Sequence, residues 1–358
     1  MSISVSIIGT GSVLPDQIVP NSAFLGCDFY DEKGQPFPHS NEIIIQKFEE
    51  ITEIRERRWA NPEELCSTLG TRAAAHALEH AGIDPETLDL IIVTHNFGDL
   101  AFGSRHTDQM PTLASRVKAG LGIRNPNAVA FDVLAGCPGW VQSVLTAQSY
   151  MLAGHAKRAL VVGNEMLSRT LDVHDRDSMI FADGAGAACF ALRPSEHGEG
   201  IMGYAAVSYT KDEAYYLKSL PSVNPAGDPN ERLIRMKGRK IYEFALRHVP
   251  DGMKAALDNA GVHLSEIKKI FIHQANAKLD HAVIERLHRL YGMKVDHVDA
   301  IAPMSVQWLG NSSVATVPTL LDLVVKTQYQ GHKIQRGDLL LFASVGAGMT
   351  INAFVYRW

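Results

Sequence analysis

The chain has 358 residues, of which 46% are hydrophobic and 20% are charged, and its formal net charge at pH 7 is −5. This composition is typical of a globular protein with a large core, and the acidic balance argues against a general nucleic-acid or anionic-membrane surface. No run of about 18 apolar residues occurs and residues 1–10 lack the layout of a secretory signal, so we expect a cytoplasmic protein without a membrane span. The four cysteines have neither disulfide-framework nor zinc-ligand spacing.

The first half of the chain contains a helix followed by a buried strand. Residues 77–95 read as the end of a helix with Gly82 at the left-handed cap position, a short acidic connection and a strand of four apolar residues. Residues 27–41 and 97–110 fit no such unit and are expected to be loops. Loops of about 12 or more residues in a compact domain are often functional.

Cys137 stands between a short apolar strand and a helix expected from about Trp140 to Leu152. Unpaired backbone N–H groups and the positive dipole end of a helix favour a thiolate over a thiol at this position. We therefore interpret Cys137 as a candidate nucleophile. The alternative is a small buried residue without chemistry, which is the usual role of an intracellular cysteine.

The second half of the chain repeats the first. Residues 256–274 echo residues 77–95 at an offset of half the chain, with Gly261 in the place of Gly82. A period this long excludes a solenoid, so we predict two duplicated α/β halves, 1–195 carrying the nucleophile and 196–358, packed as layers. Glycine hairpins are expected at 183–187 and 346–348, after a later strand of each half.

Two polar positions in the second half are candidate partners of Cys137. His273 ends the second-half strand in His273-Gln274-Ala275-Asn276, at the carboxyl end of a predicted parallel sheet, where ligands bind. Asn311 precedes a buried helix in Gly-Asn-Ser-Ser. Taken alone, His273 also fits a hydrogen-bonded structural histidine and Asn311 fits a helix N-cap.

Together these motifs resemble the decarboxylating condensing enzymes of the thiolase superfamily, and most closely the β-ketoacyl-acyl-carrier-protein synthase III family. The resemblance covers nearly the whole chain. An asparagine as third member, after Cys137 and His273, is similar to synthase III and the chalcone-synthase-like branch, whereas elongating synthases use a second histidine and thiolases a second cysteine. The likeness implies a five-layered αβαβα fold, each half with a mixed, mostly parallel sheet, and a homodimer.

The same resemblance implies that an acyl primer thioester is condensed with malonyl-acyl-carrier protein to give a 3-oxoacyl-acyl-carrier protein, which initiates fatty acid synthesis. Cys137 holds the acyl group, and His273 Nε2 and the Asn311 amide donate hydrogen bonds to the enolate oxygen. The backbone N–H groups of Cys137 and Ala347 hold the tetrahedral oxyanion. Neither a metal nor an organic cofactor is implied, because the substrates themselves carry coenzyme A or phosphopantetheine.

The likeness also implies a set of substrate-binding residues: Arg176, Phe181, Asn276, Lys278 and Val345. Two of these depart from the family pattern. Lys278 replaces a nucleotide-contacting arginine, and lysine cannot give the same planar bidentate contact to phosphate. Val345 stands where a phenylalanine is common, so a smaller gate is expected to admit a longer or branched primer or an aromatic starter.

Lys47 and Ile51 stand where relatives that use coenzyme A primers usually place the Trp and Arg that sandwich adenine. We therefore expect a primer on an acyl-carrier protein to be favoured over acyl-CoA. Lys237 and Arg239, with Arg176 and Lys278, form a possible basic rim for a phosphopantetheine arm or an acidic carrier helix. The sequence does not identify the primer.

Three other functions are weighed against this one. A specialised condensing enzyme or acyltransferase of secondary metabolism, of polyketide, alkylresorcinol or quinolone type, has the same chemistry and is not separated from fatty acid synthesis by these residues. A cysteine hydrolase leaves Asn311 without a role. A silent partner subunit normally lacks the nucleophile, so Cys137 argues against it.

Overall fold

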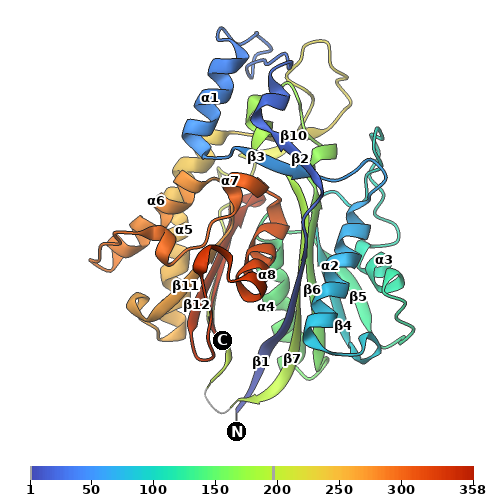
Figure 1. Cartoon of the computed structure of the whole chain (residues 1–358), viewed down its shortest axis with the longest axis vertical. Helices are drawn as coiled ribbons and strands as arrows, with labels where there is room; N and C mark the ends of the chain where they lie inside the picture. The colour runs from blue at the N-terminus through green and yellow to red at the C-terminus, as the bar shows by residue number, and fades with distance from the viewer. Residues whose placement is uncertain (1, 196–197) are drawn as a thin grey trace.

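The computed structural model describes residues 2–195 and 198–358, which form five alternating layers of helices and sheets (Figure 1). The helices are α1 (Asn41–Thr52), α2 (Cys66–Ala81), α3 (Leu113–Gly120), α4 (Gly139–Leu152), α5 (Gly238–Ala260), α6 (Ala277–Leu290), α7 (Val306–Leu309) and α8 (Thr316–Thr327). The strands are β1 (Ser2–Val13), β2 (Gln17–Pro20), β3 (Glu56–Trp59), β4 (Leu90–Thr94), β5 (Val129–Val133), β6 (Arg158–Met166), β7 (Asp183–Ser195), β8 (Gly200–Ser208), β9 (Leu217–Leu220), β10 (Leu233–Met236), β11 (Ile267–Ile272), β12 (Leu339–Gly346) and β13 (Thr350–Arg357).

The two large sheets have matching strand orders, which confirms the duplication. The first runs β1-β7-β6-β4-β5, with β4 parallel to both β5 and β6 and the other pairs antiparallel. The second runs β11-β12-β13-β8, with β11 parallel to β12 and the other pairs antiparallel. The order β4-β6-β7-β1 therefore corresponds to β11-β12-β13-β8. The helices that precede β4 and β11 both end at a left-handed glycine, Gly82 with φ 62° and Gly261 with φ 65°.

Helices α4 and α8 form the central layer between the two sheets. Each contacts strands of both sheets, while α2 and α3 cover the outer face of the first sheet and α5, with α6 packed on it, covers the second (Figure 1). The central core is aromatic: Phe342 stacks between Phe271 and Phe354, at centroid distances of 5.1 and 4.6 Å, and Trp140 packs beside it. Both sheets are covered on both faces, which explains why β4 and β12 are nearly continuous apolar runs.

One local prediction is wrong. Residues 183–187 are not a hairpin but the first residues of β7, paired with β6 on one side and β1 on the other. Their small side chains allow close packing instead of a turn, since an added Cβ at Gly186 would lie 2.6 Å from the Thr319 nitrogen in α8. The second predicted turn, residues 346–348, does connect β12 and β13.

The two predicted excursions are loops, and both are fixed to the body of the protein. In residues 97–110, Asp99 and Asp108 pair in an isolated bridge, and both accept hydrogen bonds or ion pairs from Arg116 of α3. In residues 27–41, Phe37 lies under the Arg176 guanidinium at 4.5 Å. Among residues 2–195 and 198–358, no helix is long and apolar enough to cross a membrane.

Candidate active site

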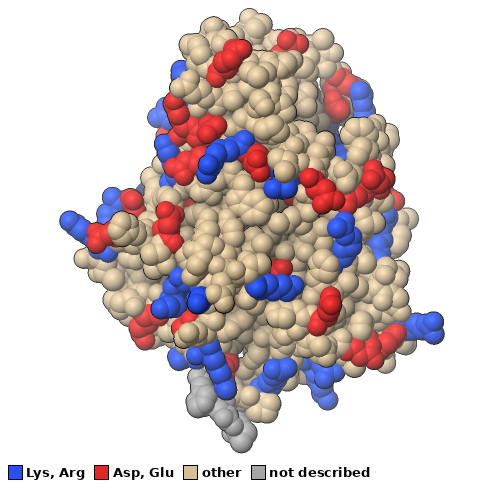
Figure 2. Space-filling model, in the orientation of Figure 1, with Lys and Arg blue, Asp and Glu red and all other residues tan. Residues whose placement is uncertain are grey.

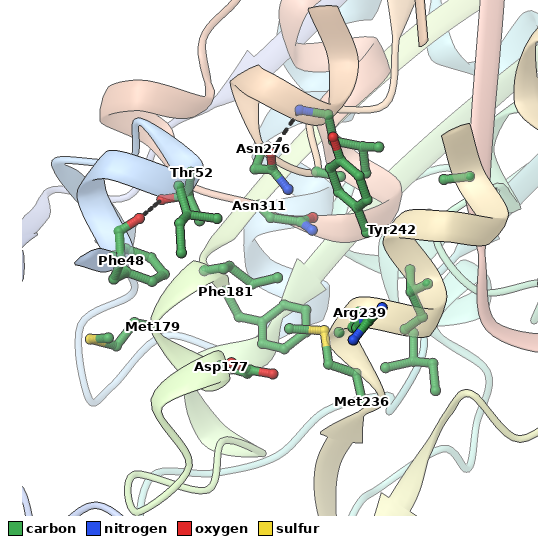
Figure 3. A pocket seen from close by; sticks show the side chains of 18 of the residues that line it. Phe48, Thr52, Asp177, Met179, Phe181, Met236, Arg239, Tyr242, Asn276 and Asn311 are labelled. Carbon is green, nitrogen blue, oxygen red and sulfur yellow. Dashed lines mark hydrogen bonds between the residues drawn. The ribbon is translucent and has the colours of Figure 1, made fainter. Parts of the chain in front are cut away.

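A cavity of about 430 Å³ lies where the two halves meet, and Cys137, His273 and Asn311 all line it. Its walls come from α1, from the turn before β7, from α5 with the β9–β10 hairpin, and from the start of α6. Figure 3 shows Phe48, Phe181 and Met236 among the mostly apolar side chains of these walls, with the amides of Asn276 and Asn311 near each other on one side. Three polar groups therefore meet in a mostly apolar cavity. Along the chain, 136 residues separate Cys137 from His273 and 38 separate His273 from Asn311.

Cys137 lies in the tight turn between β5 and α4, two residues before the helix begins. Gly136 makes the turn possible, because its φ of 64° is one that other residues rarely adopt. Burial raises the pKa of the Cys137 thiol to about 11, and the hydrogen bond from the Ser313 hydroxyl acts in the opposite direction. The expectation of a resting thiolate at the helix start is therefore wrong, because desolvation of the sulfur outweighs the local backbone field.

His273 follows β11, and its backbone N–H donates to Ala343 of β12 at 2.9 Å, which continues the ladder of the sheet. Its Nδ1 lies 2.7 Å from the Thr316 hydroxyl, and that hydroxyl donates to the Ser313 carbonyl at 2.9 Å. A hydroxyl has one proton, so in this arrangement Nδ1 carries the ring hydrogen and donates it to Thr316. Burial lowers the pKa of His273 to about 4, which keeps the ring neutral with Nε2 as an acceptor.

Asn311 is held by both its backbone and its side chain. Its N–H donates to Ile180 at 2.8 Å, and its carbonyl accepts from Ala182 at 3.0 Å, which joins it to the turn before β7. The side-chain Oδ1 accepts from the Ser313 backbone N–H at 2.8 Å. This fixes the orientation of the amide and leaves its Nδ2 hydrogens without a partner among the described residues. Asn311 thus supplies a buried, oriented donor pair to the cavity.

The β12–β13 turn packs against the nucleophile turn at two adjacent residues. Gly346 lines the cavity, and an added Cβ there would lie 2.7 Å from the Cys137 nitrogen. The Ala347 nitrogen lies 2.9 Å from the position that a Cβ would take on Gly136, the residue before Cys137, and Ala347 is not among the cavity-lining residues. The turn that carries Ala347 thus lies against the nucleophile turn, and the role of its N–H in an oxyanion hole stays a prediction.

Sequence reasoning missed Ser313. Its hydroxyl donates to Cys137 Sγ at 3.2 Å and accepts from Asn96 Nδ2 at 2.9 Å. The signal for it was present, because Ser313 is the second serine of the Gly-Asn-Ser-Ser motif. The motif alone does not show that a side chain 176 positions away would meet the sulfur.

Four of the five predicted substrate-binding residues line the cavity: Arg176, Phe181, Asn276 and Val345. Lys278 does not. It lies in a separate surface depression whose other lining residues include Glu42, Glu49 and Glu53, because the first turn of α6 directs it away from the cavity. No cluster of three or more potential metal ligands occurs within residues 2–195 and 198–358.

Comparisons with known proteins identify the family of the chain. Two family models match, 3-oxoacyl-[acyl-carrier-protein] synthase III over residues 131–210 and its C-terminal part over residues 257–358. A β-ketoacyl-[acyl-carrier-protein] synthase III from Erythrobacter litoralis is 34% identical to this chain over 99% of it and 100% of that protein. This chain belongs to the β-ketoacyl-[acyl-carrier-protein] synthase III family.

Solved structures of condensing enzymes share the fold. The 3-oxoacyl-[acyl-carrier-protein] synthase III from Aquifex aeolicus superposes with a TM-score of 0.79 at 29% identity, over 99% of this chain and 100% of that one. The priming β-ketosynthase of the R1128 polyketide pathway gives 0.81 at 26% identity, over 99% and 96% of the two chains. The predicted thiolase-like α/β fold is confirmed.

Several of the positions expected to differ from the family pattern lie at the cavity and its rim. Lys47 and Ile51 of α1 both line the cavity, as does Arg239 at the start of α5. Lys237 does not line it, and its Nζ lies 6.0 Å from the centroid of the Tyr216 ring. Of the predicted basic rim, Arg176 and Arg239 line the cavity, and Lys47, which was not part of that prediction, adds a third positive charge there.

Proposed function

We propose that the protein catalyses the decarboxylating condensation of an acyl primer thioester with malonyl-acyl-carrier protein, which gives a 3-oxoacyl-acyl-carrier protein and initiates fatty acid synthesis. The observation that carries this proposal is the meeting of a cysteine, a neutral histidine and an oriented asparagine in one mostly apolar cavity. Family membership supports the same chemistry. The cytoplasmic location expected from the sequence is part of the proposal.

In the first half-reaction, Cys137 takes the acyl group from the primer. The thiol proton passes to His273 Nε2, the sulfur attacks the thioester carbonyl, and the primer's own carbon–sulfur bond then breaks. His273 returns the proton to the departing thiolate, which leaves as a thiol. The backbone N–H groups of Cys137 and Ala347 are proposed to hold the tetrahedral oxyanion, and the packing of the β12–β13 turn against the nucleophile turn supports this role.

In the second half-reaction, malonyl-acyl-carrier protein loses CO₂ and leaves an enolate whose charge lies on the thioester oxygen. The Asn311 Nδ2 group donates to this oxygen. His273 adds a second donor after its ring changes tautomer: Nδ1 releases its proton to solvent, Nε2 takes one up, and the Thr316 hydroxyl turns from the Ser313 carbonyl to donate to Nδ1. The carbanion attacks acyl-Cys137, and the Cys137 thiolate leaves and takes up one proton from solvent to restore the thiol. With that proton the scheme balances without a metal or an organic cofactor.

The primer is proposed to arrive on an acyl-carrier protein. Lys47 and Ile51 offer no aromatic surface for adenine at the cavity rim, whereas Lys47, Arg176 and Arg239 supply positive charge there. On the face shown in Figure 2, acidic and basic side chains are interspersed rather than gathered by sign. The positive charge at the cavity rim is therefore the feature that supports a primer on an acyl-carrier protein. Val345 beside the nucleophile favours a primer larger than acetyl.

A homodimer is part of the same proposal. Strand β5 lies at the edge of the first sheet, next to the nucleophile turn, and the side chains at its ends are apolar and uncovered. Val129 is 54% exposed and Leu134 is 60% exposed. An uncovered edge strand with exposed apolar side chains favours pairing with a second copy. A mass in solution of twice the 39.2 kDa of the chain would support this arrangement.

A second candidate is a priming condensing enzyme of secondary metabolism with a primer other than acetyl. The likeness to a priming β-ketosynthase from a polyketide pathway, together with Val345, favours it. The chemistry at Cys137 is the same, so only the identity of the primer and product separates the two candidates.

Intact-protein mass spectrometry tests the proposal. The protein is incubated with a series of acyl-CoA and acyl-carrier-protein donors, and then with malonyl-acyl-carrier protein. We expect an acyl mass on Cys137 that disappears when malonyl-acyl-carrier protein is added and a 3-oxoacyl product forms. A Cys137→Ser variant should carry no acyl group that thioester-selective cleavage removes. Acylation that decays to free acid in water alone would indicate a hydrolase and contradict the proposal.

A further inference from the structure

Ser313 is linked to all three members of the proposed catalytic set, to Cys137 and Asn311 directly and to His273 through the Thr316 hydroxyl. Its hydroxyl donates to Cys137 Sγ at 3.2 Å. Its backbone N–H donates to Asn311 Oδ1 at 2.8 Å, and its carbonyl accepts from the Thr316 hydroxyl that holds His273. It achieves this with a φ of 50°, a conformation that residues other than glycine rarely adopt.

The direction of the Ser313 hydroxyl is set from the other side. Asn96 Nδ2 donates to Ser313 Oγ at 2.9 Å, so the serine oxygen acts as an acceptor toward Asn96 and its own hydrogen is left for the sulfur. The Asn96 amide is itself held, because Nδ2 also donates to Glu165 Oε2 and the Asn96 backbone N–H lies 3.4 Å from Glu165 Oε1. Both Nδ2 hydrogens are therefore used.

Two members of this chain are fully buried and two, Asn96 and Cys137, are half-buried. Glu165 and Ser313 are each 1% exposed, and neither lines the substrate cavity. The serine hydroxyl therefore donates from the protein side of the sulfur, where a hydrogen bond to a charged group is stronger than in water. An aligned donor is most valuable here because burial otherwise opposes negative charge on this sulfur.

We propose that Ser313 is a fourth catalytic residue, whose hydroxyl stabilises negative charge on Cys137 sulfur, and that Asn96 and Glu165 are positioning residues that hold this hydroxyl in the donor orientation. The sulfur carries that charge twice in the reaction of the proposed function, on which this role rests. It does so once when it attacks the primer and again when it leaves the second tetrahedral intermediate. No covalent bond to Ser313 forms at either point.

The test must separate the hydroxyl of Ser313 from its backbone, which holds Asn311 and Thr316. Ser313→Ala removes only the hydroxyl. Ser313→Gly also removes it and is free of side-chain strain at positive φ, so it replaces the alanine variant if that variant fails to fold. Ser312→Ala is the matched control, since it makes the same change one residue earlier and no hydrogen bond joins Ser312 to Cys137.

The readout is the rate of alkylation of Cys137 by iodoacetamide at a fixed pH near 8, followed on the Cys137 peptide by mass spectrometry. Loss of a hydrogen bond to a charged group lowers the thiolate population by about tenfold or more. Because a more basic thiolate is also a better nucleophile, we expect the alkylation rate of Ser313→Ala to fall by about threefold. Ser312→Ala should react at the wild-type rate.

Asn96→Ala tests the positioning step. It should slow alkylation less than Ser313→Ala does, and the double variant should match Ser313→Ala alone, because Asn96 acts only through the serine. Wild-type alkylation rates in folded Ser313→Ala and Ser313→Gly would overturn the proposal, and additive effects in the double variant would overturn the positioning role. Alkylation needs no substrate, so failure of the proposed condensation would show separately, as absence of acyl-Cys137 in the wild type.

Discussion

At the scale of single residues, the hydrogen bonds and burial of each side chain determine which of its atoms can donate or accept a proton. Cys137 and His273 are both held in their neutral forms by burial, which raises the pKa of the thiol to about 11 and lowers that of the imidazole to about 4. The pair therefore rests as thiol and imidazole, and the charge separation occurs only when a substrate carbonyl is present. Thr316 accepts the Nδ1 hydrogen and so leaves Nε2 ready to receive the thiol proton.

The Thr316→Val variant tests this role of the threonine. Valine keeps the shape but leaves the buried His273 Nδ1–H and the Ser313 carbonyl unpaired, which should lower the free energy of unfolding by about 1–3 kcal/mol. Decarboxylation of malonyl-acyl-carrier protein should fall by about tenfold, since the ring loses its fixed orientation.

Thr319→Val is the control for that variant, because Thr319 lies one turn further along α8 and makes only a 3.4 Å hydrogen bond to Ala185. It should keep nearly the wild-type CO₂ release. Equal CO₂ release by Thr316→Val and the wild type would show that Thr316 does not orient His273 for decarboxylation.

At the scale of elements, the site is made where the ends of strands and the starts of helices from both halves meet. The β5–α4 turn presents Cys137, the end of β11 presents His273, and the segment before α8 presents Asn311 and Ser313. In the β12–β13 turn, Gly346 packs against the backbone of Cys137. Glycine is required there because the backbone of Cys137 occupies the space that a side chain would need.

The Gly346→Ala variant tests this closure. Its Cβ would lie 2.7 Å from the Cys137 nitrogen, so the turn must shift, and the adjacent Ala347 N–H, the proposed oxyanion donor, is displaced with it. Displacement of one such donor typically costs about 100-fold or more in kcat. Ala347→Gly keeps the backbone N–H and should retain activity within a few-fold, and a wild-type kcat in Gly346→Ala would contradict the closure of this turn on the site.

At the scale of the whole molecule, the duplicated fold brings the two halves together over a shared aromatic core and leaves buried carboxyl groups behind the nucleophile. Glu165 is one of these, and burial raises its pKa to about 8, with nearby Asp183 acting in the same direction. The native protein thus keeps a proton on Glu165 at pH values where the unfolded chain has lost it.

The Glu165→Gln variant tests this linkage. Between pH 5 and 8 the native state holds more protons at this position than the unfolded state, so the contribution of Glu165 to the free energy of unfolding must fall as the pH rises. The free energy of unfolding of the wild type minus that of Glu165→Gln should therefore decrease with pH, by up to about 1.4 kcal/mol per pH unit. Denaturant titrations across this range measure it, and a difference independent of pH would show that Glu165 is already ionised.

Much of the fold and site follows from local patterns, because Cys137, His273 and Asn311 each stand at the boundary of an element that the sequence marks. The repeat at half-chain spacing likewise predicts the matching sheets. What could not be predicted depends on long-range packing. Ser313 meets Cys137 only once α8 lies between the sheets, and burial, which decides the protonation of that sulfur, is a property of the folded protein.

Two further differences come from local geometry. The side chain of Lys278 leaves the cavity because of its phase on α6. Residues 183–187 form a strand because glycine and alanine permit close packing as readily as they permit a turn.

Release of labelled CO₂ from malonyl-acyl-carrier protein tests the central claim most directly, with wild type compared to Cys137→Ala, His273→Ala and Asn311→Ala. The account predicts that His273→Ala and Asn311→Ala each lose CO₂ release by about 100-fold, because each removes a donor to the enolate oxygen. Cys137→Ala should still release CO₂ but form no 3-oxoacyl product. Undiminished CO₂ release in both His273→Ala and Asn311→Ala would contradict the account.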